Sequence, residues 1–340
     1  MSAESSIQTL SAPNPGVDLA GEILAQARSR DATHVHIEPH AGGTRVRMRI
    51  GGQLSEALSL PAPVDLDFAD HGVDVARLAT PHGERMVLHL PEPAMRFGEL
   101  EALGMPSRLA LALGSDLSRG GLMIIAGPDG SGKATTLRAL LREADDGTRN
   151  VLTAQTTDEI RAALRQDPDV LMIASIADRE TAALAVQAAG AGHLVLGGID
   201  ARDAVAAIHR LRDWRVEPFQ LASTLRAVVA QRLVKRLCRS CREPVQAQGS
   251  VSSLLGFDSG AVVYAPVGCD QCDGGYAGRT AVFEAIHADA ALRRLINDGG
   301  DGAIIARHAF LNAPNLGSAA RTLVRQGIIT PEEAVRISRS

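Results

Sequence analysis

Residues 127–132 form a glycine-rich segment that joins an apolar run, residues 122–126, to a helix-forming stretch beginning at Lys133. The spacing matches GxxxxGK. In that pattern loop N–H groups and the helix N-terminus cradle a phosphate chain, and the lysine reaches the β- and γ-phosphates. The segment therefore predicts a nucleotide phosphate site. Its expected residues are Gly127, Pro128, Asp129, Gly130, Ser131, Gly132, Lys133, Ala134, Thr135 and Thr136.

The residue after the lysine does not fit a hydrolytic site. A Ser or Thr hydroxyl normally holds Mg²⁺ at this position, and here it is Ala134. Thr135 is one residue further along, so on a helix it points about 100° away. Asp129 places a negative charge within the loop, where it would repel a phosphate. The motif predicts ATP binding and leaves Mg²⁺ coordination doubtful.

All four cysteines of the chain lie in two CxxC pairs, Cys238 with Cys241 and Cys269 with Cys272. Two such pairs can place four thiolates tetrahedrally around Zn²⁺. Two disulfides are the alternative, which a cytoplasmic location disfavours. With four protein ligands the site would be closed, so we expect a structural zinc.

Composition excludes several classes of protein. The 340 residues allow two or three domains, and 45% apolar and 22% charged residues are ordinary for a globular chain. The net charge of −4 and 3% aromatic content disfavour nucleic-acid binding. No apolar run approaches the ~18 residues of a membrane span, and the start lacks a secretory signal pattern. We expect a cytoplasmic protein without direct membrane insertion, so that any membrane role would come through a partner.

The N-terminal region predicts a flexible tail at residues 1–16 and a small α+β domain at residues 17–95. Residues 17–29 have helical periodicity, and residues 32–40 and 44–50 alternate as strands, with a second pair expected at 73–75 and 84–90. His34, His36 and His40 lack further ligands, so a metal site is disfavoured. Arg45, Arg47 and Arg49 suit a solvated strand face, and presentation to a phosphate is the alternative.

Beyond residue 96, apolar strand-like runs alternate with helical stretches, which is typical of a parallel sheet covered on both faces. After residues 97–118, a packing segment, strands are expected at 122–126, 150–153, 170–173 and 193–196, and helices at 160–166, 178–190 and 201–211. Residues 246–258 are expected to be a polar loop. Helices follow at 291–298 and 317–326, and a last one begins at Pro331 with Thr330 as N-cap and Glu333 at its third position.

Several stretches carry a family resemblance. RQDPDVLMI (165–173), DRETAALAVQAAGAGHLVL (178–196) and VEPFQLASTLRAVVAQRLVKRLC (216–238) resemble ATPases of type II secretion and type IV pilus assembly, as do THVHIEP, PHGERMVLHL and GRTAVFE. The resemblance implies a RecA-like domain at 96–236, a PAS-like first domain that closes over nucleotide, and a tetracysteine element with C-terminal helices at 237–340. It also implies a hexameric motor coupled to an inner-membrane platform protein.

The chain departs from the family where carboxylates are needed. The acidic box that follows the strand beginning at Asn150 places its first two acidic positions on Gln155 and Thr156. Only Glu159 is left as a candidate catalytic carboxylate. Such groups orient water and hold hydrated Mg²⁺ during phosphoryl transfer. The resemblance therefore implies a weakened hydrolytic site.

Further departures follow along the chain. Ser175 and Ala177 stand where the family has Glu and Arg, and Asp200 lies in the run that replaces Leu-His-Thr, although the earlier His193 is kept. Asp178 and Glu180 instead suit the start of a helix.

Loss of one acid or base group costs ~10²–10⁴ in rate, and groups acting as a unit do not add simply. These losses predict an ATP-binding subunit with weak or absent hydrolysis, in a homo- or hetero-hexamer with a paralogous ATPase. An active assembly ATPase is the alternative, and a zinc-ribbon nucleic-acid binder a distant one.

Overall fold

The computed structural model describes residues 8–9, 18–30, 32–50, 53–60, 66, 68, 73–90, 100–258 and 260–339. The chain divides into two compact units, Met1–Arg96 and Phe97–Ser340. The tail predicted at residues 1–16 lies outside the described residues, apart from the short strand β1 (Gln8–Thr9), which pairs in parallel with β4.

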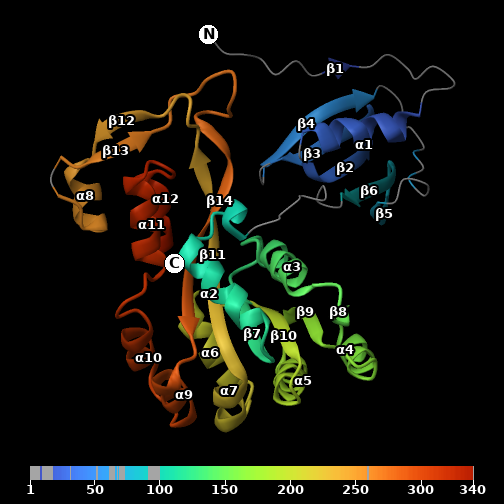
Figure 1. The fold of residues 1–340 in the computed structure, drawn as a ribbon. Coiled ribbons are helices and arrows are strands. Elements are labelled where there is room, and N and C mark those ends of the chain that lie inside the picture. Colours follow the sequence, from blue (N-terminus) through green and yellow to red (C-terminus); the bar gives the residue numbers. More distant parts are fainter. Residues whose placement is uncertain are drawn as a thin grey trace. The chain divides into compact units, whose positions relative to one another are not determined.

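The described residues of the first unit form one sheet with one helix (Figure 1). Strand order is β1-β4-β3-β2-β6-β5, and all neighbours except β1 and β4 are antiparallel. Its other elements are α1 (Leu19–Ser29), β2 (Ala32–His40), β3 (Gly43–Ile50), β4 (Gln53–Leu60), β5 (Asp74–Thr80) and β6 (Gly83–His89). Alternate residues of β2 and β3 share a core with α1, as the period-two pattern predicts. This unit is the predicted PAS-like α+β domain, and β4 is the strand that sequence patterning missed.

The second unit is built on a six-stranded sheet of order β14-β11-β7-β10-β9-β8. The five strands from β11 to β8 are parallel, and β14 pairs antiparallel with β11. Its strands are β7 (Gly121–Ala126), β8 (Val151–Ala154), β9 (Val170–Ile176), β10 (Leu194–Ile199), β11 (Leu225–Leu237) and β14 (Tyr276–His287). This is the predicted α/β, RecA-like sheet.

Helices cover both faces of this sheet, because its apolar residues alternate between two cores. In β7, Leu122 and Ile124 lie in the core with α4, α5 and α6, whereas Met123 and Ile125 pack with α2 and α3 on the opposite face. Every residue of β7 is buried, as a central parallel strand requires. The helices are η2 (Leu100–Leu103), α2 (Ser107–Leu117), α3 (Lys133–Ala144), α4 (Thr157–Leu164), α5 (Arg179–Gly190), α6 (Ala204–Asp213) and α7 (Pro218–Thr224).

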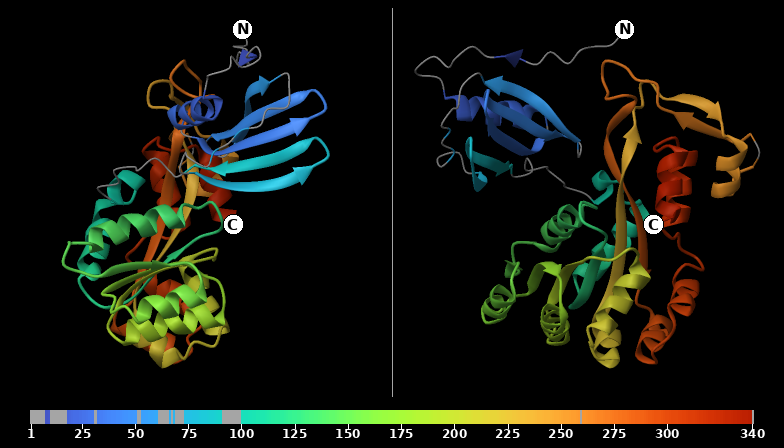
Figure 2. Two further views of the ribbon diagram at one scale, coloured as in Figure 1. Left: turned by 90° about the vertical axis from the view of Figure 1, so that its right-hand side faces the viewer. Right: turned by 180° about the vertical axis from the view of Figure 1, so that it is seen from behind.

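Strands β11 and β14 are the two longest of the second unit and extend beyond the rest of the sheet toward the C-terminal elements (Figure 2). They were not identified as strands from the sequence. The C-terminal elements are β12 (Glu243–Gln246), α8 (Gly249–Leu255), β13 (Val262–Ala265), α9 (Ala290–Asn297), α10 (Gly302–Ala309), α11 (Leu316–Arg325) and α12 (Pro331–Arg339).

The prediction of a polar loop at residues 246–258 is wrong, because this segment contains α8. Leu255 is buried, and Val251 one turn earlier packs against the same core. Gly256 ends the helix with φ of 63°, in the left-handed conformation that glycine adopts without a steric penalty. The apolar side of α8 faces α12, so tertiary packing stabilises a short helix with weak local signals.

Side-chain caps set several helix starts. The helix predicted at 160–166 begins earlier, at Thr157, because Thr156 caps it. The helix predicted at 201–211 begins later, at Ala204, because Asp203 accepts a hydrogen bond from the Ala206 N–H. The last helix begins at Pro331 as predicted, and the Thr330 hydroxyl accepts from the Glu333 N–H at 3.5 Å.

A buried carboxylate ties β14 to two helices. Glu284 is 3% exposed and accepts hydrogen bonds from the Ala204 and Leu316 N–H groups, each at 2.8 Å. These are the first residues of α6 and α11, where unpaired N–H groups and the helix dipole favour a negative charge. Burial nevertheless raises the pKa of Glu284 above its usual value, because desolvation outweighs the two backbone hydrogen bonds.

We predict that Glu284→Gln lowers the free energy of unfolding by about 1–3 kcal/mol, because the amide can accept only one of the two buried N–H bonds. A raised folded-state pKa means that the folded protein holds the proton more tightly. The stability contributed by Glu284 is therefore greatest below its unfolded pKa and falls as the pH rises through its folded pKa. Glutamine does not titrate, so the stability of the variant lacks this pH dependence. The difference in the free energy of unfolding between wild type and variant should therefore shrink between pH 5 and pH 8.

Denaturant unfolding at both pH values measures the effect. Exposed Glu243→Gln on β12 is the matched control and should change stability little at either pH. A loss of unfolding free energy in Glu284→Gln that grows with pH would contradict this account of the carboxylate.

Candidate functional site

Three adjacent parallel strands bring their carboxyl ends to one edge of the second unit's sheet. The register aligns Ala126 at the end of β7 with Ile199 at the end of β10, and Ile199 with Ile176 at the end of β9. In open α/β sheets, ligands bind outside the carboxyl ends of the strands. The phosphate loop, Ser175 and Asp200 therefore share one edge.

The loop between β7 and α3 has the conformation that its glycines predict. Gly130 and Gly132 have φ of 73° and 90°, which place them in the left-handed region. Gly127 is needed for a different reason, since a Cβ there would lie 2.3 Å from Ser131 Oγ and 2.8 Å from the Gln231 carbonyl oxygen. The chain turns tightly here and leads directly into the α3 N-terminus at Lys133.

Gln231 of β11 holds the loop from the side. Its Nε2 donates to the Ser131 carbonyl oxygen at 2.8 Å, and the side chain is 1% exposed. Sequence analysis missed this residue, although one amide within the apolar run of β11 was a signal. Ser131 Oγ is buried and has no hydrogen-bond partner among the described residues. A buried unpaired hydroxyl beside loop N–H groups suits a phosphate oxygen.

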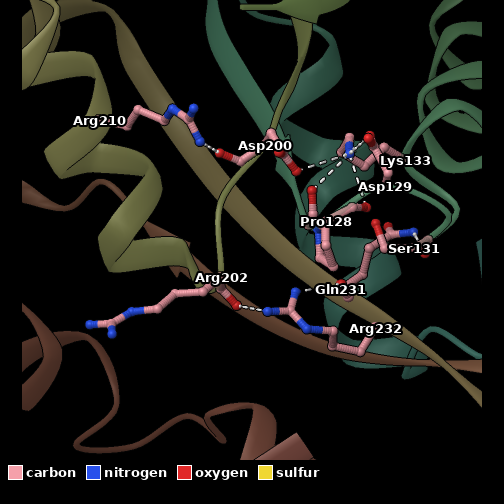
Figure 3. A network of polar contacts seen from close by, with 10 residues as sticks. Pro128, Asp129, Ser131, Lys133, Asp200, Arg202, Arg210, Gln231 and Arg232 are labelled. Carbon is pink, nitrogen blue, oxygen red and sulfur yellow. Dashed lines mark hydrogen bonds and ion pairs between the residues drawn. The ribbon is translucent and has the colours of Figure 1, made fainter. Parts of the chain in front are cut away.

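Lys133 lies at the centre of a polar network (Figure 3). Its Nζ donates to the carbonyl oxygens of Gly127, at 2.7 Å, and Pro128, at 3.0 Å. Nζ also lies 3.7 Å from Asp200 Oδ1 and 3.8 Å from Asp129 Oδ1. The predicted phosphate-binding cation is thus paired with two carboxylates of its own chain.

Two arginines hold the neighbouring backbone. Arg210 of α6 donates to the Asp200 carbonyl oxygen, and Arg232 of β11 donates to the Arg202 carbonyl oxygen (Figure 3). Burial lowers the pKa of Arg232. These contacts fix the path of the chain after β10, and neither arginine was singled out from the sequence.

The residues around the expected metal position offer few oxygen ligands. Ala134, in the first turn of α3, has no hydroxyl, and Thr136 is 1% exposed in the hydrophobic core. Thr135 is half-buried on the same turn. Ser175 is exposed near the end of β9, where the resembled family carries a carboxylate. Hard divalent cations favour carboxylate ligands, and none of these four side chains carries one.

Glu159, the one candidate catalytic carboxylate, is engaged by its own helix. Its Oε2 accepts from the Gln155 N–H at 2.7 Å and the Thr156 N–H at 3.4 Å, and the Thr156 hydroxyl accepts from the Glu159 N–H. This is a reciprocal capping box at the start of α4. The carboxylate therefore has a structural task in this conformation.

Asp178 caps the start of α5, as predicted, and Glu180 lies in the first turn of the same helix. The Asp178 carboxylate accepts from the Thr181 N–H at 2.8 Å at the start of α5. Hydrogen bonds from Thr181 lower the pKa of Asp178 below its usual value. Glu180 pairs with Arg161 of α4.

The four cysteines gather at the far ends of β11 and β14. Their Sγ atoms lie within 4.8 Å of one another, with Cys241–Cys272 and Cys269–Cys272 at 3.6 Å and Cys238–Cys269 at 3.9 Å. Four thiolates at ~2.3 Å from a tetrahedral Zn²⁺ would be about 3.8 Å apart. A disulfide requires an Sγ–Sγ distance of about 2.05 Å, and all four cysteines are free in the structure, so the two disulfides given as the alternative are not formed.

The thiols of the cluster differ in acidity. Burial raises the pKa of Cys241. For Cys269, the Gln271 backbone hydrogen bond lowers the pKa, but burial and hydrogen bonds with the other thiols outweigh it and raise the pKa to about 12. Hydrogen bonding from the Ser240 backbone is the largest effect that lowers the pKa of Cys238, to about 7. The cluster is the only group among the described residues whose His, Cys, Asp or Glu atoms converge as metal ligands. Zn²⁺ fits this donor set.

In the first unit, the arginine row is largely engaged with carboxylates. Arg47 pairs with Glu38 at 2.6 Å and Arg45 with Glu56 at 3.4 Å, which favours a structural face over a phosphate site. His34 packs edge-on against the His89 ring at 4.6 Å, and burial lowers the pKa of His34. Among the described residues, these histidines do not belong to a group whose ligand atoms converge as they would on a metal ion.

Comparison with known proteins identifies relatives over almost the whole chain. The family model described as "Type II/IV secretion system protein" matches residues 62–160 and 154–336. "Type II secretion system protein E" of Pseudomonas aeruginosa is 34% identical, and the match covers 96% of this chain and 76% of that protein. "Type II secretion system ATPase E" of Vibrio cholerae is 32% identical with the same coverage. "Type IV pilus assembly ATPase PilB" of Acinetobacter baylyi is 29% identical over 95% of this chain and 66% of its own.

Solved structures share the fold. The pilus retraction motor PilT with bound ADP aligns with a TM-score of 0.67 and 21% identity, covering 94% of this chain and 96% of its own. The ATPase DotB of Legionella pneumophila aligns with a TM-score of 0.69 and 17% identity, and the alignment covers 98% of this chain and 99% of DotB. No helix in the described part of the chain is both long and apolar enough to cross a membrane. With the family model matching most of its length, the chain belongs to the type II/IV secretion system protein family.

Proposed function

We propose that this chain is an ATP-binding subunit of type II secretion or type IV pilus assembly machinery, in which hydrolysis is weak or absent. The observation that supports it most is the edge of the second unit's sheet. There an intact phosphate loop lies beside strand ends that carry Ser175 and Asp200. Relatives named as secretion and pilus ATPases support the machinery in which it acts.

Nucleotide binding follows from the loop. Gly130 and Gly132 adopt the turn conformations, the α3 N-terminus points its N–H groups at the loop, and Ser131 Oγ is buried without a hydrogen-bond partner in the described part of the chain. These groups would hold the phosphates, and Lys133 would contribute a cation once released from its own carbonyl acceptors. When bound, ATP would supply the phosphate chain whose charge these groups neutralise.

Weak hydrolysis follows from the missing acids. In-line attack of water needs a base or an orienting group and a held metal ion. Ala134 lacks the hydroxyl, Ser175 lacks the carboxylate, and Glu159 caps its own helix. The subunit would then act in a homo- or hetero-hexamer in which a paralogous ATPase performs the chemistry. Its place would be the cytoplasmic side of an inner-membrane platform protein, and its cysteine cluster would hold a structural zinc.

We predict that the purified chain turns over Mg²⁺-ATP at least roughly 10²-fold more slowly than a relative with intact carboxylates, because the acid/base and metal-holding groups are absent. Lys133→Ala should weaken ATP binding and leave the residual turnover at background. Phosphate release under saturating ATP measures the rate, and calorimetric titration measures binding.

Ser175→Glu combined with Ala134→Thr returns two of the lost groups and should raise turnover above the wild-type value. Exposed Asp213→Asn serves as the matched surface control. If wild-type turnover equals that of a relative with intact carboxylates and disappears in Lys133→Ala, the chain is instead an active assembly ATPase, which is the second candidate function. The intact lysine and loop are what favour that candidate.

The cysteine cluster generates a separate prediction. The purified chain should contain about one zinc per chain by elemental analysis, and Cys269→Ser should lose the metal and lower the thermal midpoint, because the site links the ends of β11 and β14. Ser240→Ala, between the first two cysteines, is the control and should keep the zinc. A metal-free native chain with four reactive thiols would refute the zinc site.

A further inference from the structure

Asp200 occupies a defined place relative to the phosphate loop. It follows Ile199, which is aligned with Ala126 at the end of β7, so its side chain starts beside the loop. Its carbonyl oxygen accepts from Arg210, which anchors the backbone at this point. Oδ1 lies 3.7 Å from Lys133 Nζ (Figure 3).

Two carboxylates beside one ammonium group give the surroundings of Lys133 a net negative charge. One ammonium group at Lys133 is met by the carboxylates of Asp129 and Asp200, both within 4 Å of Nζ. Asp129 is fully exposed and free to turn into solvent, whereas Asp200 is about half-exposed and lies on a strand end. Asp200 is therefore the carboxylate that stays beside the lysine tip.

The position of each phosphate in such a loop follows from its geometry. The loop N–H groups cradle the α- and β-phosphates, and the lysine reaches the β- and γ-phosphates. A carboxylate beside the lysine competes with the γ-phosphate for the same cation. It also repels the additional negative charge, since two like charges about 4 Å apart near a protein surface interact strongly. A diphosphate lacks the γ-phosphate and therefore brings less negative charge beside Asp200.

We propose that Asp200 sets the phosphate specificity of the loop, so that it binds a nucleoside diphosphate in preference to the triphosphate. This inference rests on the proposed nucleotide-binding function and names its ligand class. The other task for this carboxylate is as a Mg²⁺ ligand. The lysine contact disfavours that task, because a cation at the metal position would have to displace Nζ or lie next to it.

The test is calorimetric titration of the full chain with ADP and with ATP, first in EDTA and then with Mg²⁺, using a β,γ-imido analogue for the triphosphate. Wild type should bind ADP roughly tenfold more tightly than the triphosphate. Asp200→Asn should tighten triphosphate binding about tenfold and change ADP binding by less than about threefold, so that the preference disappears.

Asp213→Asn, which removes the same charge at the exposed end of α6, should leave the wild-type preference intact. Equal binding of both nucleotides by wild type, or an unchanged ratio in Asp200→Asn, overturns the inference alone. Weaker Mg²⁺-dependent binding in Asp200→Asn also overturns it and identifies Asp200 as a metal ligand. Failure of both nucleotides to bind wild type and Asp200→Asn overturns the inference together with the nucleotide-binding function.

Discussion

The parallel register of β7, β10 and β9 is the constraint on which the site depends. Because the three strands run in one direction with aligned ends, the loop after β7, Asp200 after β10 and Ser175 near the end of β9 meet at one edge. Two helical layers bury both faces of the sheet, which keeps the ends in place. The chemistry of this edge is then decided by a few residues that play little part in the core.

That separation explains how the fold can persist while the chemistry changes. Core strands such as β7 contribute apolar area on both faces, whereas exposed strand-end residues contribute little to stability. Replacing a carboxylate by Ser175 leaves the packing intact, and Glu159 is retained in a capping role that stabilises α4. Under the proposed function, the subunit keeps the architecture of its relatives while the residues at this edge differ.

Much of the architecture could be predicted from local patterns. The apolar runs predicted four of the five parallel strands, all except β11, the glycine spacing predicted the loop, and the CxxC spacing predicted the cysteine cluster, since each depends on residues close in sequence. What could not be predicted depends on distant partners. The Gln231 contact with Ser131 joins residues 100 positions apart, and α8 is stabilised by packing on the last helices. The contact of Lys133 with Asp200 likewise appears only when two strand ends are aligned.

One strand connects the two sites of the second unit. Gln231, in the middle of β11, donates a hydrogen bond to the phosphate loop, and Cys238 follows the end of the same strand. Seven residues of extended chain span roughly 23 Å at about 3.3 Å each. β11 is paired along this length with β14, which leads back toward Cys269 and Cys272. The phosphate loop and the cysteine cluster therefore share one antiparallel strand pair, whose register shifts once, between Lys235 and Leu237, before it reaches the cysteines.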